Sequence, residues 1–414
     1  MSRDLRTRLA GIRSTSTPRH DPGPFILGAK TETETRAEKE TRAEPEAEPG
    51  QRMLSGWDRI SPHFWMRHMD SAVEPVNPGL EVDGAPFSIR LKDVRLSLAG
   101  MCFFDLETTG LSGGTGTVAF LATVGKFSAT SGSSPGMSSG MTDRFHTTQY
   151  IMDDYPGESD MIHRLTVDLS EAQSIVTYNG GSFDLPLFRT RCIMNGLRPP
   201  EFPWHLDLLT VARRLWRVVL PDCSLGTIER EILSIDRGPD LPGSAIPERW
   251  FSYLRGGKGA QDVLDLVFSH NDHDVRTLAR LLSLLAQGFE SGQVFRADPL
   301  GLAVLLGRSN PVLALRILEA AMAEGETRAI KPLMRTYWKA GRHQERMDLV
   351  PQLPEDTYGL YMKSVRAEKL DRDLEAAICL ADQALANASG SMAIRLESRL
   401  KRLGLLLAVK GSAH

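Results

Sequence analysis

The chain has 414 residues, of which 41% are hydrophobic and 24% charged, a composition typical of globular proteins with a sizeable core. Its formal net charge of −3 excludes a global basic field, so any nucleic-acid binding must depend on local patches. The four cysteines are widely spaced, which argues against a zinc site or a disulfide scaffold and favours a reducing, cytoplasmic location. Because the sequence has no apolar run of about 18 residues, no membrane partner is expected.

The first hundred residues divide into two segments. Residues 1–50 are predicted to be a disordered charged tail, because "KTETETRAEKETRAEPEAEPG" repeats ETRAE and has almost nothing apolar to bury. Residues 51–99 form an N-terminal extension that leads into the core. Within it, the alternating apolar residues of "FSIRLKDVRLSL" predict a strand.

Residues 100–290 have the pattern of a mixed α/β domain. The predicted strands are "MCFFDLE", "VAFLATVGKF", "FHTTQYIM" and "SIVTYNG". The predicted helices are "DMIHRLTVDL", "DLPLFRTRCIMNGL", "LDLLTVARRLW" and "VLDLVFSHNDHDVRTLARLLSLL". Strands that come first and helices that come mainly afterwards favour a mixed sheet flanked by helices.

Residues 295–414 carry helix patterns and no strand signal. Stretches such as "YWKAGRHQER" and "RAEKLDRDLEAA" fall at similar places in successive helix pairs. This pattern resembles a degenerate tetratricopeptide-like array, in which helix pairs bury their faces by stacking. The sequence therefore predicts an all-α repeat domain that binds a protein partner or a nucleic acid.

Two carboxylates follow the first apolar strand of the α/β domain. Asp105 and Glu107 are two residues apart, so both point to the same face of a strand. Two carboxylates this close repel each other, and a divalent cation bound between them relieves the repulsion. Taken alone, the simpler interpretation is that both face water. The glycine-rich "GLSGGTGT" that follows is a poor nucleotide loop, because it lacks a Walker lysine and leads into a strand.

Two further segments place carboxylates at helices. Asp184, in "TYNGGSFDLPLF", stands at a predicted helix start, where a lone Asp is by default a helix cap. In "SHNDHDVRTLARLL", His270 and Asp274 are four apart and share one face of a helix predicted to begin there. Asp272 is interpreted as the cap of that helix, and His273 as an exposed helix residue.

The order Asp-x-Glu, Asp, Asp resembles the DEDD exonucleases of the ribonuclease-H-like fold. The motifs "FDLETTGL", "NGxSFDxP" and "HNxxDV" resemble the YprB-like family of predicted metal-dependent exonucleases, over roughly residues 85–290 and loosely in the tail. The resemblance implies a ribonuclease-H-like mixed sheet followed by the helical domain. It also implies a metal-dependent 3′–5′ exonuclease that hydrolyses phosphodiester bonds at the 3′ ends of single-stranded DNA or RNA.

The same resemblance implies two divalent ions, Mg²⁺ or Mn²⁺, which suit a site made of oxygen ligands. In such enzymes one ion generates hydroxide and the other stabilises the leaving oxygen. Transferred by motif, Asp105 bridges both ions, and Glu107 and Asp274 complete the site of the ion that carries the nucleophile. Asp184 holds the second ion.

The fifth catalytic residue departs from the family pattern. The family has a His five positions before the last Asp or a Tyr four positions before it, whereas this chain has Ser269 and His270 at those places. A shift of one residue rotates a helical side chain by about 100°. His270 therefore orients the attacking water, binds a phosphate, or only stabilises the helix start. The candidates for substrate contact are Thr108, Asn179 and Phe183.

The sequence is also compatible with a second function. The chain is alternatively a catalytically weak or inactive ribonuclease-H-like protein, which binds nucleic acid or acts as a scaffold through its helical repeats. Retention of all four carboxylates favours the enzyme, because a scaffold has no need of so costly a charge cluster. The departure at His270 favours the alternative.

Overall fold

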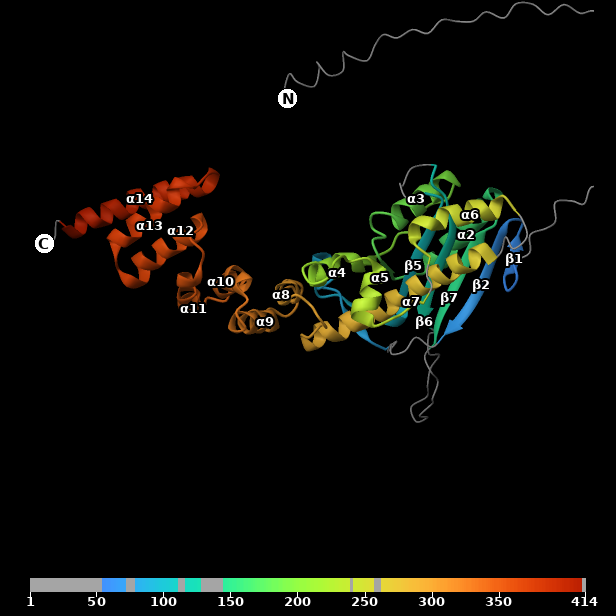
Figure 1. The fold of residues 1–414 in the computed structure, drawn as a ribbon, viewed down its shortest axis with the longest axis horizontal. Coiled ribbons are helices and arrows are strands. Elements are labelled where there is room, and N and C mark those ends of the chain that lie inside the picture. The colour runs from blue at the N-terminus through green and yellow to red at the C-terminus, as the bar shows by residue number, and fades with distance from the viewer. Residues whose placement is uncertain are drawn as a thin grey trace, which may run out of the picture. The chain divides into compact units, whose positions relative to one another are not determined.

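The computed structural model describes residues 54–71, 79–110, 116–127, 144–238, 241–256 and 262–411 (Figure 1). The predicted charged tail, residues 1–50, lies outside the described residues. None of the helices within the described ranges combines the length and the apolar character that a membrane span requires.

Seven strands form one mixed sheet in the order β1-β2-β7-β6-β5-β8-β9. Neighbouring strands are antiparallel from β1 to β5, and β8 is parallel to both β5 and β9. The strands predicted from apolar runs are confirmed at β5, β6, β7 and β8. The strands are β1 (Asp58–Ser61), β2 (Phe64–Ser71), β5 (Met101–Thr108), β6 (Ala119–Phe127), β7 (Phe145–Met152), β8 (Ser174–Thr177) and β9 (Trp204–Asp207).

Helices cover both faces of this sheet, which confirms the predicted fold class. The alternation of β5 divides its side chains between two cores, with Met101 and Phe103 in one and Phe104 and Leu106 in the other. The first core packs against α4 and the second half of α7, and the second core packs against α2, α3 and α6. The helices are α2 (Glu158–Ser170), α3 (Asp184–Met194), α4 (Leu208–Trp216), α5 (Leu225–Ile228), α6 (Ile246–Leu254) and α7 (Asp262–Ser291).

The predicted all-α region is confirmed as well. Most consecutive helices of this region contact one another and bury small cores between them. The first two helices also share the larger core of α4 and α7. The helices are α8 (Pro299–Leu306), α9 (Pro311–Ala323), α10 (Ile330–Lys339), α11 (His343–Asp348), α12 (Thr357–Arg366), α13 (Leu374–Ala386) and α14 (Gly390–Gly411).

The strand predicted in "FSIRLKDVRLSL" is wrong for most of its length. A 3-10 turn at Ile89–Leu91 leaves Ile89 65% exposed, and Asp93 takes a left-handed backbone with φ of 65°. An extended chain cannot continue through such a residue. Only the end of the segment is a strand, and it pairs in a separate two-stranded sheet made of β3 (Glu81–Asp83) and β4 (Arg95–Ser97).

Candidate active site

The four predicted carboxylates come from three elements that meet near the carboxyl-terminal ends of the parallel strands β5 and β8. Asp105 and Glu107 lie at the end of β5, Asp184 is the first residue of α3, and Asp274 lies within α7. The pKa of the Asp105 carboxyl is raised well above its usual value, first by burial and then by the negative charges of Asp274, Asp184 and Glu107. The four side chains are therefore close enough to interact, and we call them the carboxylate cluster.

A row of polar side chains fixes α7 over the sheet beside this cluster. Asp105, Thr123 and Gln149 stand opposite one another on β5, β6 and β7. Asn271 of α7 is fully buried; its Nδ2 donates to Asp105 Oδ2 at 2.6 Å, and its Oδ1 accepts from the Thr123 hydroxyl. Gln149 Nε2 donates to Thr123 Oγ1 and to the carbonyl of Phe268, both at 2.9 Å. Asn271 thus orients Asp105, a role that the sequence analysis missed.

The sequence interpretation of Asp272 as a helix cap is wrong. The helix does not begin near His270 but at Asp262, so Asp272 lies inside α7. Its carboxylate is buried and accepts from Thr147 Oγ1 at 2.6 Å and from Arg276 Nε at 2.5 Å. Asp272 therefore anchors α7 to β7. His273 is exposed, as predicted.

Asp184 follows a tight turn that Asp207 holds in place. The backbone N–H groups of Asn179 and Gly181 donate to the Asp207 carboxylate at 2.8 and 3.2 Å, and Asp207 also caps α4 through Leu209 N at 3.1 Å. Asn179 has a φ of 65°, the left-handed conformation that Asn tolerates better than most residues. Its backbone therefore shapes the turn that presents Asp184.

The two other substrate candidates lie near the same strand ends. Phe183, directly before Asp184, leaves 51% of its surface exposed, unusual for a large apolar side chain. Thr108 ends β5, and its hydroxyl donates to the carbonyl of Gly110 at 2.8 Å. The glycine-rich segment then connects β5 to β6, although residues 111–115 lie outside the described residues.

His270 shares a helix face with Asp274, as the spacing predicts. Its Nε2 lies 3.7 Å from Asp274 Oδ2, and its Nδ1 lies 3.4 Å from Arg237 Nη1. The side chain is 14% exposed.

An arginine beside Asp274 was missed by the sequence analysis. Arg237 binds Glu229 through Nε at 2.5 Å and Nη2 at 2.6 Å, and Nη2 also donates to the Asp274 carboxylate. Burial lowers the pKa of Arg237, but Glu229 and Asp274 outweigh this effect and the net shift is upward. Glu229 is only 2% exposed and also accepts from the Thr277 hydroxyl. Arg237 lies in a loop without periodicity, so its sequence position gave no signal.

The donor set of the cluster fits a divalent cation. Among the described residues no three His, Cys, Asp or Glu side chains are already arranged as metal ligands. Arg237 and Asn271 instead bind Asp274 and Asp105. The pKa values of Asp105 and Asp184 are raised by burial and, to a smaller extent, by neighbouring carboxylates, an effect that a bound cation would oppose. Mg²⁺ and Mn²⁺ prefer such carboxylate oxygens.

Asp184 makes the stability of the metal-free protein depend on pH. Its pKa is raised to about 7, chiefly by burial and further by Asp207 and Asp274, while two backbone N–H groups oppose the rise. A carboxyl with a raised pKa binds more protons in the folded than in the unfolded state, so stability falls as pH rises from about 4 to about 7. We expect Asp184→Asn to raise the free energy of unfolding by about 1–3 kcal/mol at pH 8 and to change it little at pH 4.

Thermal or urea unfolding in the presence of a chelator, measured at both pH values, checks this prediction. Asp382→Asn, at an exposed position of α13, is the matched control and should be neutral at either pH. An equal effect of Asp184→Asn at pH 4 and pH 8 would contradict the assigned electrostatic cause.

Residues 102–286 are similar to a known superfamily of proteins. The profile of the RNase_H superfamily matches this segment. YprB of Bacillus subtilis (strain 168), described as an uncharacterized protein, is 36% identical over 181 residues, which cover 43% of this chain and 40% of the relative. The match thus spans less than half of that relative. The family B DNA polymerase of the hyperthermophilic archaeon Pyrobaculum calidifontis is similar at a TM-score of 0.34 and 14% identity, over 54% of this chain and 29% of that one, a likeness too low to support an argument.

Proposed function

We propose that the chain is a metal-dependent 3′–5′ exonuclease acting on single-stranded DNA or RNA, because residues 102–286 match the RNase_H superfamily profile and the chain is similar to YprB. The observation that carries the proposal is the convergence of Asp105, Glu107, Asp184 and Asp274, from three separate elements, near the carboxyl-terminal ends of β5 and β8. Carboxylates held together at this cost, with the pKa values of Asp105 and Asp184 raised by burial, are typical of functional sites.

The proposed division of roles follows the motif in which each side chain stands. Two Mg²⁺ or Mn²⁺ ions, when bound, would activate a water at neutral pH and neutralise charge at the leaving oxygen. Asp105 would help to hold both ions, Glu107 and Asp274 would hold one, and Asp184 would hold the other. Asn271 holds the orientation of Asp105, and the exposed ring of Phe183 offers a stacking surface to a terminal base.

The test is digestion of single-stranded DNA and RNA labelled at either end, with Mg²⁺, with Mn²⁺, or with a chelator. We expect mononucleotides to be released from the 3′ end, only with a metal. One observation favours the alternative of a weak or inactive nucleic-acid-binding protein: Arg237 already pairs with Asp274. Binding of the oligonucleotides without release of mononucleotides in either metal would establish that alternative.

His270 is proposed to orient the attacking water beside Asp274. If it does, His270→Ala lowers kcat by about 10²–10⁴-fold, the usual contribution of a general base. The variant should keep its fold and its affinity for oligonucleotide. Single-turnover rates with saturating enzyme measure the effect. The matched control is His273→Ala, at an exposed position of the same helix. Equal rates for the two variants would remove His270 from the mechanism.

A further inference from the structure

Helix α4 carries a row of basic side chains on its exposed face. Thr210, Arg213, Arg214 and Arg217 follow the spacing i, i+3, i+4, i+7, so all four lie on one side of the helix. The opposite side is buried in the core of the domain. Its residues are Leu208, Leu209, Val211, Ala212, Leu215 and Trp216.

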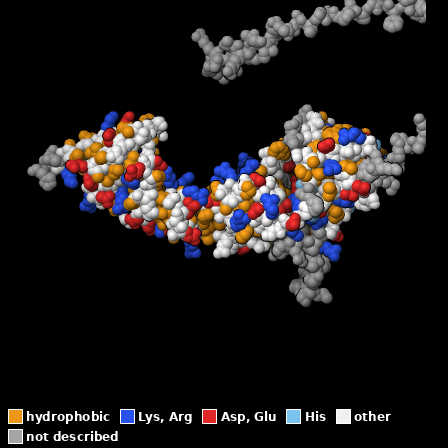
Figure 2. Space-filling model, viewed as in Figure 1, with side chains coloured by type: hydrophobic (Ala, Val, Ile, Leu, Met, Phe, Trp, Pro, Cys, Tyr) orange, Lys and Arg blue, Asp and Glu red, His pale blue; other side chains and the backbone are white. Residues whose placement is uncertain are grey.

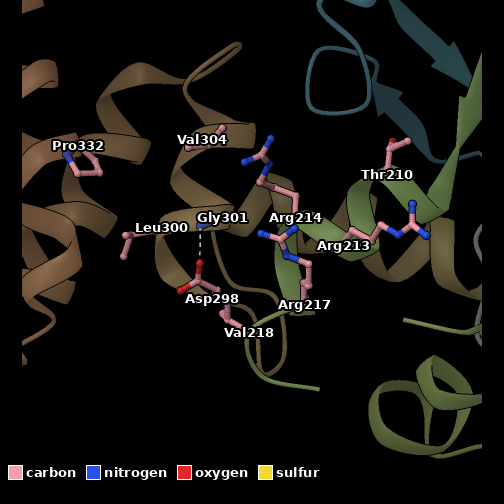
Figure 3. A pocket seen from close by; sticks show the side chains of 10 residues that line it. All are labelled: Thr210, Arg213, Arg214, Arg217, Val218, Asp298, Leu300, Gly301, Val304 and Pro332. Atoms are coloured by element: carbon pink, nitrogen blue, oxygen red, sulfur yellow. Dashed lines mark hydrogen bonds between the residues drawn. The ribbon is translucent and has the colours of Figure 1, made fainter. Parts of the chain in front are cut away.

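This basic face forms one wall of a groove of about 340 Å³ against α8. Figure 3 shows Arg214 and Arg217 extending toward α8, while Arg213 extends toward the side of Thr210. The opposite wall is made of Leu300, Gly301 and Val304, with Asp298 at the start of α8 and Pro332 from α10.

The two walls of the groove are held together by specific contacts. The backbone N–H of Asp298 donates to the carbonyl of Leu215 at 2.7 Å, and Trp216 Nε1 donates to the carbonyl of Phe295 at 3.0 Å. Gly301 packs so closely on α4 that a Cβ there would lie 2.0 Å from the Arg214 carbonyl oxygen. The spacing of the groove is therefore fixed by the fold.

The arginines of this groove lack a neutralising acid. Among the described residues, none of the carboxylates forms a salt bridge with Arg213, Arg214 or Arg217. Asp298 is already engaged, because its Oδ2 accepts from Gly301 N at 3.1 Å and its Oδ1 binds Arg328 at 3.0 Å. Three guanidinium groups on one helix face repel one another, and a polyanion on this face would relieve that repulsion.

Basic side chains continue beyond the groove along α10. A second groove, which shares Val304 and Pro332 with the first, is bordered by Arg335 and Lys339, both exposed and four residues apart. Figure 2 shows Lys and Arg side chains gathered over this part of the molecule. A continuous series of cations fits an extended chain of phosphates better than a single small anion.

The basic face begins beside the carboxylate cluster. Asp207 caps the first turn of α4 and binds the turn before Asp184, whose pKa its charge helps to raise. Since α4 has nine residues, it is about 13 Å long, and the residues that line the groove follow from Thr210 in its first turn to Arg217 directly after its end. We propose that the groove of Arg213, Arg214 and Arg217 binds the phosphodiester backbone of a single strand whose 3′ end lies at the carboxylate cluster.

This inference rests on the proposed function for the direction of the strand, but binding is measurable without catalysis. The experiment uses full-length Asp105→Asn protein with a chelator, and fluorescence anisotropy of single-stranded DNA and RNA of about 20 nucleotides, longer than most single-domain sites. We expect Arg214→Ala/Arg217→Ala to raise Kd about tenfold or more. The slope of log Kd against log salt should fall by about 1.4, because each phosphate contact on a single strand contributes about 0.7.

The matched control is Arg395→Ala/Lys401→Ala, which removes the same charge from exposed positions of α14 and should change Kd less than twofold. Equal effects of the two double variants on Kd, or the absence of binding to both DNA and RNA, would contradict the proposal that the groove binds a single strand. Digestion by the wild-type protein distinguishes this failure from that of the proposed function. If the wild-type protein releases mononucleotides and the groove variant keeps the same Kd, only the proposed binding site in the groove is refuted. If binding depends on the groove but no mononucleotides are released, only the proposed exonuclease activity is refuted.

Discussion

Asp105→Asn should lower the rate of oligonucleotide hydrolysis by about 10³-fold or more, equivalent to about 4 kcal/mol of transition-state stabilisation. The charges of Asp274, Asp184 and Glu107 all act on Asp105, and the change removes the carboxylate that is assigned to both proposed metal ions. Asn has the size of Asp, and burial disfavours a charge at this position. We therefore expect the variant to fold and to be at least as stable as the wild-type protein without metal.

Initial rates on a 3′-labelled strand in Mg²⁺ and in Mn²⁺ measure this effect, with unfolding curves recorded in parallel. The matched control is Asp265→Asn, an exposed position on α7, which should keep the wild-type rate within about twofold. A fully active and well-folded Asp105→Asn protein would show that hydrolysis takes place elsewhere in the chain.

Arg237→Ala should destabilise the protein by about 3–5 kcal/mol, because it leaves the buried carboxylate of Glu229 without its cation. The double variant Arg237→Ala/Glu229→Gln should recover most of this loss. The amide introduced by Glu229→Gln keeps a polar partner for the hydroxyl of Thr277, and no buried charge remains at that position. Urea unfolding of the wild-type protein, both single variants and the double variant gives the coupling energy.

The activity of the same four proteins separates a structural from a functional role for Arg237. If Arg237 only neutralises Glu229, the double variant regains both stability and hydrolysis. If Arg237 also acts on the substrate or on Asp274, the double variant is stable and remains slow. A single variant Arg237→Ala that unfolds like the wild-type protein would contradict the importance of the pair.

The sequence predicted the parts of the fold that a local pattern determines. Apolar runs bounded by turn residues identified β5, β6 and β8, which are buried on both faces, and β-branched and aromatic residues identified β7. Strand β2 was missed because "FWMRHMDS" mixes charged and aromatic residues, as an antiparallel strand near the edge of a sheet can. Strand β9 was missed because its four residues run directly into α4.

The carboxylate cluster was predictable because its four members stand in recognisable motifs, and the structure brings them together. Their supporting residues were not predictable in the same way. Asn271 acquires its role only through the register that sets Asp105 opposite Thr123. The pairing of Arg237 with Glu229 connects a loop to a short buried helix, and it follows from tertiary packing that no local spacing encodes.

The core shared by α4, α7, α8 and α9 has a consequence for how the chain unfolds. Ending the chain after Ser291 would expose the face of α4 that carries Leu215 and would remove the carbonyl that binds Trp216 Nε1. The first helices of the C-terminal helical region are therefore part of the same cooperative unit as the sheet, and this junction should melt in one transition with the domain rather than as a separate module. A workable boundary for an isolated domain lies after α9 or α10, not at the end of the ribonuclease-H-like segment.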